Sequence, residues 1–133
     1  MLNFNKIIFY ISFLFFSFLF SCKKKISING LDSQSFKSDR QACNGFREKV
    51  GKDFNSIRLQ LKSLTQSEIV ELLGRPDFQV LETHGQKYYV YFMEKGNQCI
   101  NKDDPNKTKT LVLHFNAVEL VSEASIEIGK PIN

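Results

Sequence analysis

Hydrophobic positions change their spacing along the chain, and these changes separate a leader, a helical part and a strand part. Residues 7–20 form a 14-residue run that is apolar except for two serines. Between residues 39 and 61, apolar side chains recur every three or four positions, a spacing that predicts a helix with one buried face. Gly45 and Gly51 each weaken this helix, so a break or a ragged start is the alternative to a continuous helix. Beyond residue 77 the period falls to two, which predicts strands.

A second helix is predicted over residues 66–73 by the signals at its two ends. Thr65 can cap its start, and Glu68 stands three residues further on, as in a capping box. Gly74 and Pro76 then end it, because glycine adopts the left-handed stop and proline cannot continue the helix. Two turns are too few to be stable alone, so this helix must pack against other elements.

Four later segments have the composition of strands, and short turns or one polar loop join them. The segments are residues 78–82, 87–94, 110–115 and 118–128. Consecutive strands joined in this way favour antiparallel pairing. We therefore expect an α+β fold in which two N-terminal helices pack on one face of a three- to four-stranded antiparallel sheet.

The strand at residues 87–94 carries four of the nine aromatic residues outside the leader. With a period of two, Tyr89 and Tyr91 share one face, while the neighbouring positions 88, 90 and 92 share the other. We expect the second set to belong to the core. Tyr89 and Tyr91 would then be exposed, and they are candidate partner-binding residues because exposed aromatic pairs often anchor partners. Alternatively, their face is also packed, as a second core face or beneath the loop at residues 95–109.

The leader ends in Leu19-Phe20-Ser21-Cys22 and is followed by three lysines. A bilayer core needs roughly 20 apolar residues, so the shorter run fits the apolar region of a secretory signal peptide. Its end resembles a bacterial lipobox, with an aliphatic residue three positions before the cysteine and a small residue directly before it. The resemblance implies that Cys22 receives a diacylglyceryl group and becomes the first residue after cleavage. The alternative is a short uncleaved anchor with an incidental cysteine.

These features predict three segments: a signal peptide at residues 1–21, a lipidated flexible tether at 22–35 and a small domain at 36–133. The tether is rich in Ser, Asn and Gly and shows no periodicity. Removal of the leader leaves 112 residues (133 − 21). Lys23, rather than an aspartate, follows the lipobox cysteine, which favours the outer membrane, facing the periplasm or the cell surface.

The other two cysteines are expected to pair. An exported protein meets an oxidising compartment, so Cys43 and Cys99 are candidates for a disulfide that closes a loop of 57 residues. Two buried free thiols are the alternative. Two cysteines without a histidine cluster cannot complete a tetrahedral metal site, and Asp103 and Asp104 lack the spacing of a calcium loop. We expect no metal and no cofactor other than the covalent lipid on Cys22.

Charge and motif content argue against two classes of function. The formal net charge is only +4, and the basic residues form no stripe interleaved with aromatics, so no nucleic-acid partner is expected. His84 and His114 fall in a predicted turn and a predicted strand, and no Gly-x-Ser-x-Gly motif is present. We therefore expect a protein that is not an enzyme.

Residues 64–77, Leu-Thr-Gln-Ser-Glu-Ile-Val-Glu-Leu-Leu-Gly-Arg-Pro-Asp, resemble the second helix of the SmpA/OmlA, or BamE-like, outer-membrane lipoproteins. In that family a short capped helix ends in Leu-Gly-x-Pro, and an aromatic-rich strand and a Leu-x-Leu-x-Phe strand follow, as residues 88–92 and 111–115 do here. The resemblance covers roughly residues 57–128. It implies an accessory or scaffold lipoprotein that binds an envelope protein. Because β-lactamase-inhibitor-like domains share this module, the alternative is an inhibitor-like or ligand-binding module that captures a soluble target.

Overall fold

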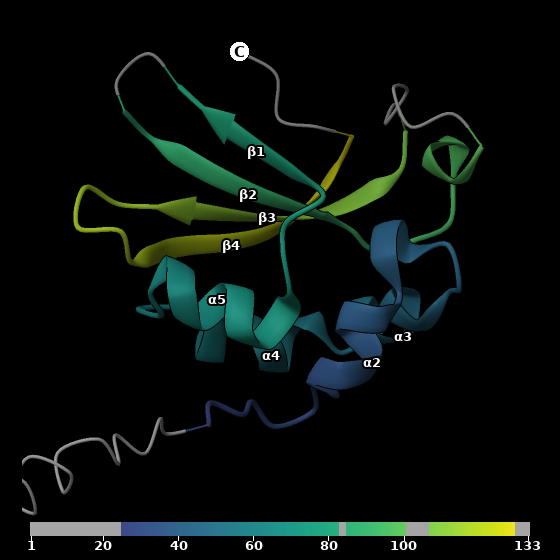
Figure 1. Cartoon of the computed structure of the whole chain (residues 1–133), viewed down its shortest axis with the longest axis horizontal. Helices are drawn as coiled ribbons and strands as arrows, with labels where there is room; N and C mark the ends of the chain where they lie inside the picture. The colour runs from purple at the N-terminus through teal and green to yellow at the C-terminus, as the bar shows by residue number, and fades with distance from the viewer. Residues whose placement is uncertain (1–24, 83–84, 101–106, 130–133) are drawn as a thin grey trace, which may run out of the picture.

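The computed structural model describes residues 25–82, 85–100 and 107–129, which form helices and strands (Figure 1). The elements are α2 (Ser33–Ser38), η1 (Arg40–Ala42), α3 (Phe46–Lys52), α4 (Phe54–Leu61), α5 (Gln66–Leu73), β1 (Phe78–Leu81), β2 (Lys87–Phe92), η2 (Asn97–Cys99), β3 (Lys109–Phe115) and β4 (Val121–Ile128). The expected α+β class with an antiparallel sheet is confirmed, and the sheet has four strands. None of the helices in the described ranges is long and apolar enough to cross a membrane.

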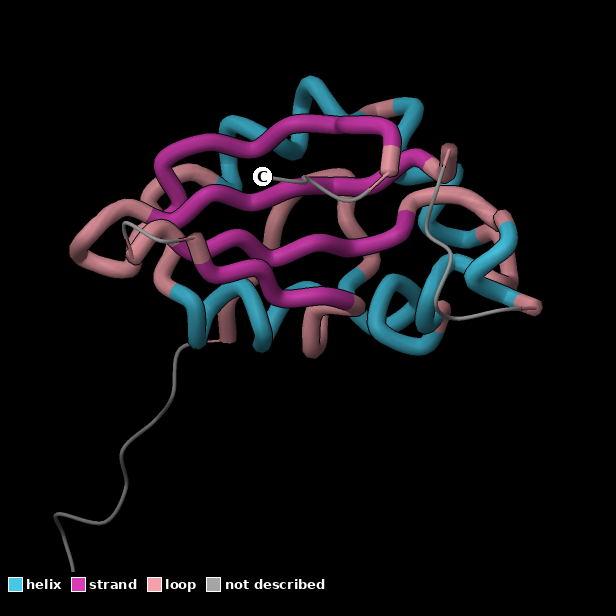
Figure 2. The backbone as a smooth tube through the Cα atoms, turned by 90° about the horizontal axis from the view of Figure 1, so that it is seen from above, coloured by secondary structure: helices cyan, strands magenta, loops and turns pink. Residues whose placement is uncertain are grey.

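The sheet is a meander in which each strand pairs with its neighbour in sequence, in the order β1-β2-β3-β4. All three pairings are antiparallel, and the register places Tyr89 opposite Leu113 and Tyr91 opposite Leu111. The helices lie on one side of the sheet, and a view from above shows the strands laid across them (Figure 2). We call the side that faces the helices the inner face and the opposite side the outer face.

The main hydrophobic core fills the space between the helices and the inner face. The helical layer contributes Phe36, Val50, Phe54, Ile57, Leu61, Ile69, Leu72 and Leu73, and the strands contribute Tyr89, Tyr91, Leu111, Leu113, Phe115, Val121 and Ala124. Burial of one large apolar side chain stabilises a fold by about 1.5–3 kcal/mol, so this interface is the main source of cohesion between the layers.

The helix expected from about residue 39 to residue 61 is divided into η1, α3 and α4, and α3 begins directly after Gly45 and ends one residue after Gly51, where a break was the alternative. Its apolar side chains keep their three- and four-residue spacing, but the backbone turns at Gln41 and Ala42, whose φ angles are 59° and 58°. The carboxylate of Asp39 accepts hydrogen bonds from the backbone N–H groups of Asn44 (2.7 Å) and Arg47 (3.0 Å) and holds this turn. Together with α2 and α5, the described chain therefore has four α-helices instead of the two expected.

Part of the expected tether packs against the domain. Ile28 is only 7% exposed, and α2 begins at Ser33 with the Asp32 carboxylate as its N-terminal cap. Asn29 and the side chain of Gln60 on α4 exchange two hydrogen bonds of 3.0 and 3.2 Å. The packed domain thus begins upstream of the expected boundary at residue 36.

The end signals predicted for α5 are confirmed in detail. The Thr65 hydroxyl accepts a hydrogen bond from the Glu68 N–H (3.2 Å), and the Glu68 carboxylate accepts one from the Thr65 N–H (2.7 Å). Gly74 follows the last helical residue with a φ of 79°, a value that favours glycine. This geometry fixes both ends of α5 beneath the sheet.

Candidate interaction surface

Tyr89 and Tyr91 lie on the inner face, so the expectation that they are exposed is wrong and the alternative of a second packed face is confirmed. Tyr89 is 7% exposed and Tyr91 is fully buried. Their hydroxyls reach α5, where Tyr89 donates to the Gln66 side-chain oxygen (2.8 Å) and Tyr91 donates to the Gly74 carbonyl (2.9 Å). The predicted alternation of faces along β2 is present, but both faces are apolar, and sequence spacing does not show which one the helices cover.

Burial gives these hydroxyls a structural role. Desolvation is the largest cause that raises the pKa of both Tyr89 and Tyr91. The next cause is the negative charge of Glu119 for Tyr89, and the neighbouring Tyr89 side chain for Tyr91. Both hydroxyls therefore remain protonated at neutral pH and keep donating to the helix. They attach α5 to β2 and are unavailable to a partner.

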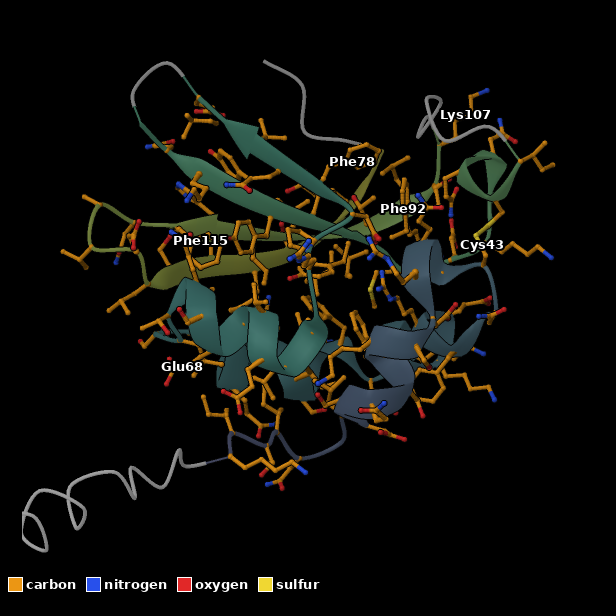
Figure 3. The ribbon with its side chains drawn as sticks, viewed as in Figure 1. Cys43, Glu68, Phe78, Phe92, Lys107 and Phe115 are labelled. Carbon is orange, nitrogen blue, oxygen red and sulfur yellow. A yellow bond between two sulfur atoms is a disulfide. The ribbon has the colours of Figure 1, made fainter. Side chains whose placement is uncertain are left out.

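The two cysteines expected to form a disulfide lie close together, at the end of the helical layer away from Glu68. The sulfur atoms of Cys43 and Cys99 lie 2.00 Å apart, at bonding distance, and their Cα atoms are 5.6 Å apart. The bridge joins the chain after η1 to η2, and Cys43 and Glu68 mark opposite ends of the helices (Figure 3). The expected lipidation site, Cys22, lies outside the described residues.

A buried glutamine reinforces the same junction. The Gln98 side-chain nitrogen donates to the carbonyls of Gln41 (3.1 Å) and Glu94 (2.8 Å), and its oxygen accepts from the Thr108 hydroxyl (3.2 Å). These partners come from three separate segments of the chain. Hydrogen bonds and the bridge therefore hold η1 and η2 together where few apolar side chains are present.

An enclosed ion pair lies next to this junction. The Arg47 guanidinium donates to the Asp77 carboxylate over 2.6 Å, and the two side chains are 1% and 0% exposed. The same carboxylate accepts from the Phe92 N–H (2.9 Å), and Arg47 also donates to the Phe36 carbonyl (3.1 Å). Because both charges are sealed from solvent and hydrogen-bonded, we assign the pair a structural role that ties α3 to β2.

The outer face carries the features best suited to contact another molecule. The rings of Tyr88 and His114 stack there with their centroids 4.6 Å apart and their planes 13° apart. The register continues this row to Val80 on β1 and Glu123 on β4. No described α-helix covers this side of the sheet (Figure 2), but Val90, Phe92 and Val112 on it are buried, as expected for positions 90 and 92, so only part of the outer face is exposed.

Three carboxylates surround the stacked pair. Burial is the main cause that raises the pKa of Tyr88, and the negative charges of Glu82, Glu127 and Glu123 raise it further. Glu123 and Glu127 are exposed, and Glu82 is half-buried. We define Glu82, Tyr88, His114, Glu123 and Glu127 as the outer-face patch.

One atom at the centre of the patch lacks a partner. The Nε2 nitrogen of His114 is buried, and no described residue forms a hydrogen bond with it. A buried polar atom without a partner is destabilising, so such atoms often mark places where a ligand completes the site. The Tyr88 hydroxyl, by contrast, donates to the Gln86 side chain (3.2 Å).

Other parts of the molecule offer less for binding or chemistry. Within the described residues, no group of three His, Cys, Asp or Glu side chains could hold a metal ion. A hollow of about 120 Å³ lies between α3 and the β3–β4 edge, but there Glu94 and Lys109 already pair at 3.5 Å. His84, Asp103 and Asp104 lie outside the described residues.

The chain matches no family model, and it is not significantly similar to any curated protein or solved structure.

The outer-face patch is not predicted by the sequence because its members come from three strands and one loop. The one sequence signal for the patch is the period of two, which places Tyr88 on the opposite face of the strand from Tyr89 and Tyr91. Pairing of Tyr88 with His114 depends on the strand register, which the spacing alone does not fix.

Proposed function

We propose that the chain is a non-enzymatic bacterial envelope lipoprotein whose α+β domain binds a protein partner at the outer membrane. The observation that carries this proposal is the lipobox-like end of the leader at Cys22. The described chain starts on the side of the helical layer that is remote from the sheet (Figure 1). A lipid on Cys22, three residues before the first described residue, would tether the domain by its helical side and leave the outer face free.

The resemblance to SmpA/OmlA lipoproteins belongs to the same proposal. It rests on the residues of the capped α5, on its stop at Gly74 and on the strand motifs that follow, and the capping box and the antiparallel meander are consistent with it. A partner-binding role is further supported by the partly exposed end of the outer face, where Tyr88 and His114 stack beside exposed glutamates. The role proposed is therefore that of an accessory or scaffold protein.

The anchor is tested by replacing the modified residue. We expect the wild-type chain to be recovered from the outer-membrane fraction, with a mass that shows loss of residues 1–21 and acylation of Cys22. The Cys22→Ser variant should accumulate as a larger, unlipidated precursor. An unchanged mass and membrane fraction in this variant would exclude the lipoprotein assignment.

The partner is tested by crosslinking in intact cells. One variant carries a photoactivatable residue in place of Glu123, which is exposed on the outer face. The matched control carries the same residue in place of Ser67, which is exposed on α5. Outer-membrane barrel-assembly proteins crosslinked from position 123 and not from position 67 would support the proposal. Recovery of a soluble enzyme alone would favour the inhibitor-like alternative.

A further inference from the structure

We infer that the outer-face patch binds a lysine- or arginine-bearing segment of the partner protein. This inference rests on the proposed function for its setting, because it names the chemistry of the partner that the domain would bind. Three independent features of the patch support it: its stacked rings, its unbalanced charge and its unpaired nitrogen.

The Tyr88 ring can contact a cation on the side that does not stack on His114. Tyr88 and His114 are nearly parallel, and both are only partly buried. Lysine ammonium and arginine guanidinium groups are attracted to the face of an aromatic ring, and nearby carboxylates add to the attraction. The three glutamates of the patch provide that negative charge around the rings.

The charge of the outer face is not balanced by the described strands. The two basic strand residues point to the inner face or its edge, where Lys87 donates to the Gln66 side chain and Lys109 pairs with Glu94. The outward strand positions therefore include Glu123 and Glu127 but no lysine or arginine within the described residues. A surface of this kind complements a cationic segment and repels an acidic one.

The unpaired nitrogen adds an observation that does not depend on charge. The Nε2 nitrogen of His114 is buried and forms no hydrogen bond with any described residue. In the neutral tautomer that leaves Nε2 unprotonated, this atom is an acceptor, and a lysine or arginine N–H is a donor that can satisfy it. The patch therefore combines a partly exposed tyrosine ring, negative charge and a buried acceptor that lacks a partner.

The measurement is fluorescence anisotropy of a short labelled peptide of alternating lysine and serine, titrated with the mature lipidated protein in neutral detergent micelles. A peptide with glutamate in place of lysine is the control ligand. We expect the lysine peptide to bind, the glutamate peptide not to bind, and binding to weaken as salt is added. Because the assay uses a peptide, it reports on the patch whether or not the cellular partner is the one proposed.

Two variants with equal changes in net charge separate a local site from general attraction. Replacement of the patch glutamates (Glu82→Gln, Glu123→Gln, Glu127→Gln) should weaken binding about tenfold, because three charge pairs disappear together. Replacement of three exposed glutamates elsewhere (Glu48→Gln, Glu71→Gln, Glu119→Gln) should change it less than about twofold. Tyr88→Leu should also weaken binding, and circular dichroism verifies that each variant is folded.

Three results would overturn the inference. The first is a lack of binding by the folded wild-type protein at low salt. The second is an equal loss in the two triple variants, which would mean that net charge alone attracts the peptide. The third is displacement of the peptide by Ca²⁺ through the same glutamates, which would make the patch a cation site. Failure of Cys22 to carry a lipid would instead remove the proposed function, and the same titration would then be run with the chain as it is isolated from cells.

Discussion

The two ends of the helical layer are attached to the sheet by different interactions. At one end α4 and α5 present stripes of leucine and isoleucine to the inner face, and two tyrosine hydroxyls add hydrogen bonds. At the other end α2 and α3 surround the Arg47–Asp77 pair, and the Cys43–Cys99 bridge joins η1 to η2. The first end depends on many interchangeable apolar side chains, whereas the second depends on a few specific partners.

This difference has a physical consequence. Truncation of an apolar side chain at the α4–α5 end costs about 2–5 kcal/mol, because its neighbours relax only partly toward the gap. Removal of a polar partner at the α2–α3 end leaves an unpaired charge or donor in a dry environment, at a cost of about 3–5 kcal/mol. We therefore expect single substitutions at the polar end to cost at least as much as core truncations, although they remove little buried apolar volume.

The largest effect is expected from Asp77→Ala. The substitution leaves the Arg47 guanidinium buried without its carboxylate and removes the acceptor of the Phe92 N–H. Breaking a buried pair in this way destabilises by about 3–5 kcal/mol. Urea unfolding followed by circular dichroism measures the free energy of unfolding.

A double variant tests whether the cost comes from the unpaired charge. Arg47→Met combined with Asp77→Leu removes both charges, so it should be more stable than Asp77→Ala alone. If the double variant were less stable by the sum of two independent losses, the pair would matter through its packing, and the contrast between the two ends would fail.

The next effect is expected from removal of the bridge. In the Cys43→Ser/Cys99→Ser variant we expect the free energy of unfolding to fall by about 2–4 kcal/mol, because the unfolded chain gains freedom. Hydrogen exchange followed by mass spectrometry should show faster exchange in α3, η1 and η2, while α5 and β3 remain protected. The Gln98 hydrogen bonds remain and should limit the opening. Equal acceleration in α5 and β3 would show that the two ends do not open separately.

The sequence predicts the α4–α5 end better than the α2–α3 end for a reason that follows from the same contrast. Helix caps and apolar stripes are encoded by residues within about one or two turns, so Thr65, Glu68 and Gly74 identify α5 directly. The polar end is defined by partners far apart in the chain. Nothing in the local pattern around Arg47 indicates that it will meet Asp77, 30 residues later.

The same limit explains the error over the tyrosines and the unpredicted patch. A period of two separates Tyr89 and Tyr91 from Tyr88, but it does not show which face the helices cover. The covered face is determined by Leu111, Leu113 and the helices that pack on them. Once that face is known, the outward position of Tyr88 beside His114 follows from the register.

A smaller effect is expected from Thr65→Ala at the apolar end. The substitution removes the hydroxyl that accepts from the Glu68 N–H and leaves one donor at the start of α5 without its cap. Loss of such a cap costs about 1 kcal/mol. Urea unfolding should show this loss, and hydrogen exchange should change at the start of α5 alone. Serine at this position keeps a hydroxyl, so Thr65→Ser is the control and should retain most of the stability.

The smallest effect is expected from Glu68→Gln, and it should depend on pH. Hydrogen bonds from the Thr65 N–H and then from its hydroxyl hold the pKa of the Glu68 carboxyl below its ordinary value of 4.5. A carboxyl with a lowered folded pKa stabilises the fold above its unfolded pKa, and this stability is lost as the pH falls through the folded value. At pH 7 the glutamine variant should be less stable than wild type by about 0.5 kcal/mol or less, because the carboxyl is exposed and glutamine can still complete a capping box. Urea titrations should show the gap closing as the pH falls below 4.5. Glu71→Gln on the same helix controls for net charge, and a gap that stays constant with pH would show that the charge of Glu68 adds nothing to the cap.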